Sequence, residues 1–278
     1  MKFSNALRIK NGHVATIAMS SDIVVYLVTG ANRPRGLGFS LVGHILRTHE
    51  NAFVYAAVRD PAKAVALHEL KEKYFDRLAI VECVSADVKS NSTMAKEIEE
   101  RHGRVDTVIA NAALLGAAAS VHEVAVKDME EHFRVNVVGP MVLFGAVYKL
   151  LKRSTNPRFI PISSPGGSLS GPIIEFPIGS VIYASTKATL NWIARKIHFE
   201  NEWIIAFPLS PGEIDTDMFD FTVSVDNGGE YQNLIKTRGY GLPPATEVAA
   251  SLLKIIDNST REENGGAFMN VDGGTLPW

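Results

Sequence analysis

Short apolar runs alternate strictly with segments of helical periodicity from Asp22 onward. The apolar runs have the length of strands, and we expect seven strands, at Val24–Thr29, Phe53–Val58, Leu78–Val84, Val105–Asn111, Arg158–Ser163, Trp203–Pro208 and Ala267–Val271. The helical patterns between them lie at Leu37–Thr48, Ala62–Phe75, Ser92–His102, Lys127–Lys152, Tyr183–Glu200 and Thr246–Ile256. Strict alternation predicts βαβ units with right-handed crossovers. The sequence therefore predicts an α/β fold with a single doubly wound parallel sheet of about seven strands flanked by helices.

Length and composition fit one large domain with an ordinary core. The chain has 278 residues, of which 46% are hydrophobic and 21% charged. Its net charge of −2 and the lack of a long Lys/Arg run argue against nucleic acid as a partner. No apolar run reaches the roughly 20 residues of a membrane span. Cys83 is the only cysteine, and we interpret it as a small buried strand residue rather than a nucleophile.

Residues 1–22 differ from the rest of the chain. Lys2, Arg8 and Lys10 precede the first carboxylate, Asp22. We expect an N-terminal extension that is disordered, with an organelle transit peptide as the alternative. The apolar content is too weak for secretion, so we predict a cytoplasmic protein whose residues 23–278 form one domain.

The first predicted strand leads into a turn that carries Gly30, Gly36 and Gly38 and opens a helix. Glycines at such a turn let the backbone approach a pyrophosphate, whose charge the helix N-terminus stabilises. A glycine turn alone is a weak signal, but its position after the first strand favours a Rossmann-type dinucleotide site.

The end of the second strand, Arg59-Asp60-Pro61, bears on the choice of cofactor. A carboxylate there binds the ribose 2′-hydroxyl of NAD, whereas an arginine pairs with the 2′-phosphate of NADP. Arg33, Arg35 and Arg59 together favour NADPH over NADH. Alternatively, Asp60 caps the next helix with Pro61 in its first position, which would also remove Asp60 from the ribose.

Tyr183 and Lys187 lie four residues apart at the start of a predicted helix. That spacing places both side chains on one face, where an ammonium favours the ionised form of a phenol. Tyr183 is therefore a candidate proton donor to a ketone.

Asn136 lies four residues before Pro140 in the long predicted helix. Pro140 has no amide hydrogen to donate to the Asn136 carbonyl and would kink the helix there, which leaves that carbonyl free. The alternative is that this bend serves packing only.

The order of the motifs resembles the short-chain dehydrogenases/reductases, in the carbonyl-reductase-like branch with the sniffer-type enzymes and the fungal ketoreductases of polyketide pathways. The resemblance extends from Asp22 to Trp278. It rests on the Thr29-Gly30 turn, Ala86-Asp87-Val88, Ala110-Asn111-Ala112, Val135-Asn136-Val137-Val138-Gly139, Ile162-Ser163-Ser164, Tyr183 with Lys187, Ser210-Pro211-Gly212 with Thr216, and Asn270-Val271-Asp272-Gly273.

The resemblance implies a site and its roles. Tyr183 is the acid, Lys187 lowers its pKa and holds the nicotinamide ribose, Ser164 rather than Ser163 is the oxyanion donor, and the Asn136 carbonyl holds a relay water. The implied cofactor-binding residues are Gly30, Asn32, Arg33, Arg35, Gly36, Leu37, Gly38, Arg59, Asp87, Val88, Asn111, Ala112, Tyr183, Lys187, Pro211, Gly212, Ile214 and Thr216. No metal is expected, because the eight histidines lack ligand spacing.

Two departures from the family pattern concern the cofactor. Five residues separate Gly30 from Gly36 where the family has three, as though Pro34-Arg35 were inserted. The longer turn would shift the pyrophosphate, weaken binding, or bulge outward and offer Arg35 as a phosphate contact. Ala113 replaces the glycine usual after Asn-Ala and adds one methyl group near the adenine ribose.

By resemblance, we expect an NADP(H)-dependent oxidoreductase that reduces a ketone on a fairly apolar small molecule, such as a secondary-metabolite intermediate. The alternatives are an alcohol dehydrogenase or epimerase, and a catalytically silent NADP-binding regulatory protein. Residues 165–182 are expected to form one wall of the substrate pocket and residues 213–242 a flap, with Met218, Phe219, Phe221 and Tyr231 as candidate lining residues. The family also implies a homodimer or homotetramer. Trp278 lies in the apolar tail, and we expect it to pack at a subunit contact.

Overall fold

The computed structural model describes residues 23–116, 118–176, 179–224, 229, 233, 237 and 241–278. The predicted N-terminal extension, residues 1–22, and Tyr231 of the predicted flap lie outside the described residues. The expectations for those parts remain predictions.

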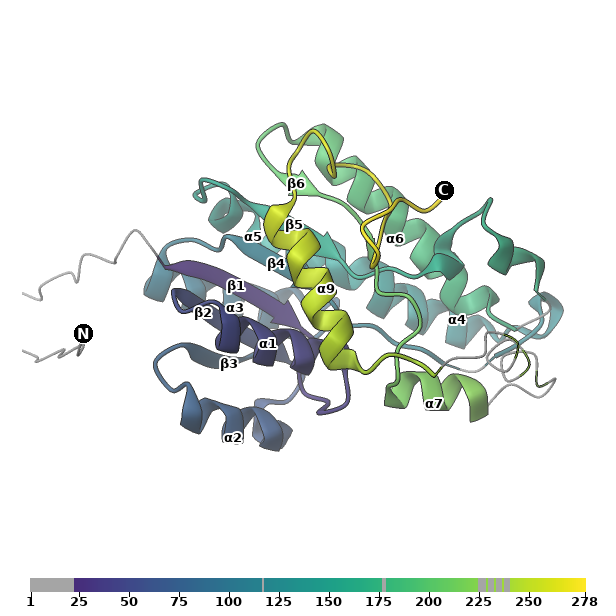
Figure 1. The fold of residues 1–278 in the computed structure, drawn as a ribbon, viewed down its shortest axis with the longest axis horizontal. Coiled ribbons are helices and arrows are strands. Elements are labelled where there is room, and N and C mark those ends of the chain that lie inside the picture. The colour runs from purple at the N-terminus through teal and green to yellow at the C-terminus, as the bar shows by residue number, and fades with distance from the viewer. Residues whose placement is uncertain are drawn as a thin grey trace, which may run out of the picture.

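A six-stranded parallel sheet forms the centre of the molecule, in the order β3-β2-β1-β4-β5-β6 (Figure 1). The strands are β1 Val24–Thr29, β2 Ala52–Val58, β3 Leu78–Glu82, β4 Thr107–Ala110, β5 Arg158–Pro161 and β6 Ile205–Ala206. The chain runs outward in one direction from β1 to β3 and in the other from β4 to β6, so the switch point lies between β1 and β4. The structure thus confirms the predicted doubly wound α/β fold, and ligands bind at such switch points.

The last two predicted strands are much shorter than expected. The stretch predicted as Trp203–Pro208 contains only the two residues of β6, because Pro208 has no amide hydrogen to contribute to a ladder. The chain continues in β7, Leu209–Ser210, which pairs in parallel with β8, Met269–Asn270, as a separate two-stranded sheet. The Pro208 carbonyl accepts from the Met269 amide at 3.0 Å and so joins the two segments.

Helices cover both faces of the sheet (Figure 1). The core on one face is formed with α1 and α9, and the core on the other with α3, α5 and α6. Alternate strand residues supply the two cores: Val28 packs with Leu41 of α1, whereas Leu27 belongs with Val147 of α5. The helices are α1 Leu37–Thr48, α2 Val65–Lys73, α3 Val88–His102, α4 Val126–Phe133, α5 Gly139–Leu151, α6 Val181–Glu200, α7 Asp217–Ser224 and α9 Ala245–Asn258.

The long helix predicted at Lys127–Lys152 is interrupted in the middle. Arg134–Val138 forms a π-helical turn, closed by a hydrogen bond from the Gly139 amide to the Arg134 carbonyl, and α5 begins directly after it. Length and composition alone would allow the run Val126–Leu151 to cross a membrane. Its α5 part instead supplies Leu143 and other side chains to the core beside the sheet, which is what a core helix does.

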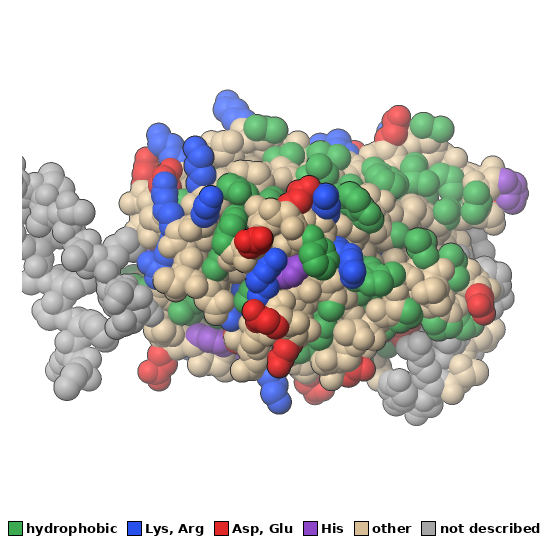
Figure 2. Space-filling model, turned by 90° about the horizontal axis from the view of Figure 1, so that it is seen from above, with side chains coloured by type: hydrophobic (Ala, Val, Ile, Leu, Met, Phe, Trp, Pro, Cys, Tyr) green, Lys and Arg blue, Asp and Glu red, His purple; other side chains and the backbone are tan. Residues whose placement is uncertain are grey.

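Charges of both signs are interspersed on one face of the molecule. On the face drawn in Figure 2, basic and acidic side chains lie among hydrophobic ones without an extended basic stripe. This distribution agrees with the small net charge and offers no field that would attract a phosphate backbone on that face.

Candidate active site

A cavity of about 480 Å³ opens where β1, β4 and β5 end. Its wall combines the glycine turn after β1, the segments after β4 and β5, the start of α6 and the approach to α7. The predicted residues in its wall are Gly30, Asn32, Arg33, Gly36, Leu37, Gly38, Arg59, Asn111, Ala112, Ser164, Tyr183, Lys187, Pro211, Gly212, Ile214 and Thr216. The structure therefore brings together most of a site whose members are dispersed over the sequence.

The glycine turn packs too closely to admit side chains. Gly30 has a φ of +69°, and a Cβ at Gly38 would lie 2.6 Å from both the Asn111 amide nitrogen and the Gly30 carbonyl. Asn111 holds the two strand ends together, because its side chain donates to the Thr29 carbonyl at 2.9 Å and its backbone amide donates to the Thr29 hydroxyl at 3.0 Å. Bare backbone at the start of α1 is what a pyrophosphate requires, so the residues present fit a dinucleotide.

Lys187 lies one helical turn beyond Tyr183 on α6. Its Nζ is 5.3 Å from the centroid of the Tyr183 ring and donates to the Ile162 carbonyl at 2.7 Å. The side chain is only 2% exposed, and this burial lowers the pKa of the amine to about 7. The amine therefore lies beside the phenol in a site that disfavours its charge until an anionic or hydroxylated partner arrives.

The two serines after β5 direct their hydroxyl groups to different partners. The Ser163 hydroxyl is buried and donates to Oδ1 of Asn191 on α6 at 2.5 Å. The Ser164 hydroxyl accepts from the Gly166 amide at 3.2 Å at the start of a 3₁₀ turn, Pro165–Gly167, and its own hydrogen remains to be donated. Ser164 is thus the serine suited to a substrate oxygen, which is the serine that the family resemblance implies.

Asn136 lies in the π-helical turn and is 1% exposed, outside the cavity wall. Its side-chain amide donates to the Leu114 carbonyl at 2.8 Å and to the Thr186 hydroxyl at 3.1 Å, while its Oδ1 accepts from the Leu114 amide at 2.7 Å. These contacts join the junction of α4 and α5 to the segment after β4 and to α6 beside Lys187. A water held by the Asn136 carbonyl remains a prediction.

Three other predicted cofactor residues lie outside the cavity wall. Asp87 caps α3 by accepting from the Ser90 amide at 2.6 Å, and Val88 is exposed. Arg35 pairs with Asp215 and is not part of the cavity wall that Arg33 and Arg59 line, so the structure does not place the three arginines in one site.

The capping role considered for Asp60 is confirmed. Its carboxylate accepts from the Ala62 amide at 3.2 Å and pairs with Lys63 at 3.0 Å, with Pro61 in the first position of a 3₁₀ turn at Pro61–Lys63. Hydrogen bonding to Lys63 lowers the pKa of this carboxyl. Cys83 follows β3, and burial raises the pKa of its thiol to about 12, which makes it a poor nucleophile.

Several cavity residues were not singled out from the sequence. Leu114, Leu115, Glu131, His132 and Val135 line the wall between Asn111 and Asn136. Their position between two predicted site residues was the available signal, but nothing in their residue types pointed to a pocket.

The loop between Ser164 and Tyr183 is held by the end of the chain. The Trp278 carbonyl accepts from the Ser170 amide at 2.9 Å, and the Trp278 ring stacks on Phe268 with the Arg195 guanidinium 4.8 Å from its centroid. These contacts lie within the chain, and the expected place of Trp278 at a subunit contact stays a prediction. The loop contributes Ile173 to the cavity wall.

Comparisons with known proteins agree with this arrangement. A family model described as short chain dehydrogenase matches residues 24–225. A short chain dehydrogenase of Penicillium aethiopicum is 33% identical over 91% of this chain and 98% of its own. A norsolorinic acid ketoreductase of Dothistroma septosporum is 30% identical, over 93% of this chain and 94% of its own. The NADPH-bound carbonyl reductase from chicken fatty liver superposes with a TM-score of 0.78 at 27% identity, covering 92% of this chain and 99% of the other.

The chain belongs to the short-chain dehydrogenase family. It is an oxidoreductase of the class that interconverts alcohols and carbonyl compounds, related to ketoreductases and to an NADPH-bound carbonyl reductase.

Proposed function

We propose that this protein uses NADPH to reduce a ketone on a fairly apolar small molecule. The observation that carries the proposal is the single cavity that joins the glycine turn to Ser164, Tyr183 and Lys187. A dinucleotide held at the glycine turn and a carbonyl held at Ser164 would share one continuous space.

The chain's own residues supply the polar part of the reaction. The reduced nicotinamide provides a hydride when bound, and negative charge then grows on the carbonyl oxygen of the substrate. Ser164 donates a hydrogen bond to that oxygen, and Tyr183 gives it a proton. Lys187 stabilises the phenolate that remains. Asn136 holds α6 and the segment after β4 together through its side-chain hydrogen bonds. Exclusion of water by the cavity strengthens each of these interactions.

The preference for NADPH rests on charge at the adenosine end. Arg33 and Arg59 line the cavity, and the Asp60 carboxylate is occupied by the Ala62 amide and by Lys63. Among the described residues, Arg33 and Arg59 form no ion pair and the Asp60 carboxylate is already paired, which suits a 2′-phosphate better than a 2′-hydroxyl.

Apolar side chains at the substrate end favour a large, weakly polar ketone. The cavity wall there includes Leu114, Ile173, Ile182, Met218 and Phe219. Such a wall excludes water and binds hydrocarbon surface, while Ser164 and Tyr183 orient the one oxygen that reacts.

We propose further that the protein is a cytoplasmic homo-oligomer. Trp192 and Phe199 on α6 and Met141 on α5 are large apolar side chains that are more than half exposed. Exposed apolar groups on neighbouring helices are suited to bury one another in a second copy.

The proposed function is tested by NADPH titration followed by NADPH oxidation with a panel of ketones. The panel includes aryl alkyl ketones and norsolorinic acid, the compound that appears in the name of one of the relatives. We expect saturable NADPH binding and turnover of at least one aryl ketone. Binding without turnover of any of them would favour a silent regulatory protein.

Arg59→Ala is expected to lower the preference for NADPH over NADH by about tenfold to a hundredfold, since a hydrogen bond to a charged group is worth about 1.5–3 kcal/mol. The measurement is the ratio of kcat/KM for the two cofactors. Arg47→Ala, which removes an exposed arginine of α1 outside the cavity wall, serves as the control. Equal losses with both cofactors would show that Arg59 does not recognise the 2′-phosphate.

A further inference from the structure

Helix α7 borders the cavity but is anchored by little apolar contact. Asp217, Met218 and Phe219 of its first turn lie in the cavity wall, directly after Thr216. None of the eight residues of α7 is buried, whereas α1 and α9 each bury several side chains in the core. Complete hydrophobic burial therefore does not fix the position of α7, and polar contacts contribute to it.

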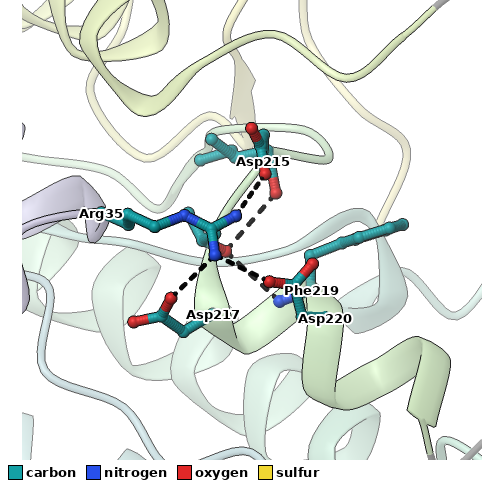
Figure 3. Close-up of polar contacts among 7 residues, drawn as sticks. Arg35, Asp215, Asp217, Phe219 and Asp220 are labelled. Carbon is teal, nitrogen blue, oxygen red and sulfur yellow. Dashed lines mark hydrogen bonds and ion pairs between the residues drawn. The ribbon is translucent and has the colours of Figure 1, made fainter.

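Arg35 provides such contacts from the opposite end of the sequence. Its guanidinium lies 2.7 Å from Oδ1 of Asp215, 3.1 Å from Oδ1 of Asp217 and 2.9 Å from Oδ2 of Asp220. Figure 3 shows the guanidinium enclosed by the three carboxylates, which come from α7 and from the segment that enters it. We call these four residues the Arg35 clasp.

The extra residues of the glycine turn make this reach possible. The Gly36 amide donates to the Arg33 carbonyl at 2.8 Å, so Pro34 and Arg35 occupy the two central positions of a tight turn. The insertion thus bulges outward and leaves Gly36 at the start of α1. On the other side, the backbone of Asp215 is fixed by a hydrogen bond from its amide to the Pro243 carbonyl at 3.0 Å.

The charges of the clasp do not balance, and this makes Arg35 important. One cation faces three carboxylates, so without Arg35 the carboxylates would repel one another and any anion in the neighbouring cavity. All four side chains are about half exposed, and a single exposed ion pair contributes little. A planar guanidinium shared by three carboxylates is a network, in which each contact is formed with the others already in place.

We propose that Arg35 is a positioning residue, which holds α7 against the glycine turn and thereby slows release of the bound dinucleotide. Both segments that Arg35 joins line the cavity, with Arg33 and Gly36 from the glycine turn and Thr216 and Asp217 from the segment that enters α7. The part concerning release rests on the proposed function, whereas the part concerning α7 does not.

The first test uses the cofactor-free protein. In Arg35→Ala, hydrogen exchange at the Phe219 and Asp220 amides, which donate to the Thr216 carbonyl, is expected to become about tenfold faster, the change that a loss of about 1.4 kcal/mol of protection produces. Arg153→Ala is the matched control, because Arg153 is an equally exposed arginine paired with Glu99 at 2.8 Å, remote from the cavity. Unchanged exchange in Arg35→Ala would overturn the proposal.

The second test measures NADPH dissociation by stopped-flow fluorescence. Release from Arg35→Ala is expected to be about tenfold faster than from the native protein, while hydride transfer in a single turnover stays within about twofold. A hydride-transfer rate that falls by as much as the release rate rises would point to general damage and contradict a positioning role. Native protein that binds neither NADPH nor NADH would contradict the proposed function, and the exchange experiment would still decide whether the clasp holds α7.

A triple variant distinguishes attachment of α7 by Arg35 from mere neutralisation of the aspartate charges. Arg35→Ala combined with Asp217→Asn and Asp220→Asn removes the repulsion but does not restore the clasp. We expect fast amide exchange in α7 and fast NADPH release to persist in this variant. Native values in the triple variant would show that Arg35 acts only by neutralising the aspartates, which overturns the proposal.

Discussion

Tyr183→Phe is expected to lower the rate of ketone reduction by about 10²–10⁴, the range that a positioned proton donor contributes. The ring that lies 5.3 Å from the Lys187 amine is kept, so the fold and NADPH binding should stay close to native. The measurements are the single-turnover rate of NADPH oxidation with an aryl ketone and the NADPH dissociation constant.

Tyr148→Phe provides the control for this result. It removes a hydroxyl that donates to Oδ1 of Asn201 at 3.1 Å, outside the cavity wall. We expect native rates from this variant. Near-native rates from Tyr183→Phe as well would remove Tyr183 from the role of acid.

Lys187→Met is expected to abolish most of the activity and to change how stability depends on pH. Burial lowers the pKa of Lys187 to about 7 from an ordinary value of 10.5. Between these values the unfolded chain binds a proton that the folded protein does not, so this group makes the native protein more stable as pH rises from about 7 to about 10. Below pH 7 the cost of the buried charge is complete, and methionine has no such cost.

Urea unfolding of the cofactor-free protein at several pH values checks this sign. The stability advantage of Lys187→Met over the native protein should be largest near pH 6 and should shrink toward pH 10. Other titrating groups contribute equally to both proteins and cancel in the difference. Lys196→Met, which replaces a half-exposed lysine of the same helix, should show no such trend. A difference for Lys187→Met that is independent of pH would mean that the buried amine does not titrate as described.

Much of the fold was predictable because its signals are local. Apolar runs and helical periodicity located β1 to β5 and most helices, since each pattern reports burial on a face that the element itself defines. Predictions failed where a single residue interrupts the structure that the surrounding sequence pattern indicates. Pro208 divides the sixth strand, and the stretch around Asn136 and Pro140 takes a π-helical turn instead of a simple kink.

In the site, too, local geometry was predictable and contacts between distant parts of the sequence were not. The spacing of Tyr183 and Lys187 fixes their geometry within one helix, and the structure places them as that spacing indicates. The partners of Arg35 could not be foreseen, because Asp215, Asp217 and Asp220 lie 180 to 185 residues away along the chain. Which arginine of the turn faces the cavity and which faces α7 depends on the shape of a turn two residues longer than usual.

The most direct measurement of the central claim follows the hydride. NADPH that carries deuterium at the transferable C4 position is supplied with an aryl ketone that the native protein turns over, and the product is analysed by mass spectrometry. We expect one deuterium on the carbinol carbon with native protein and almost no product with Tyr183→Phe in the same time. Unlabelled alcohol, or equal amounts of labelled alcohol from both proteins, would contradict the account.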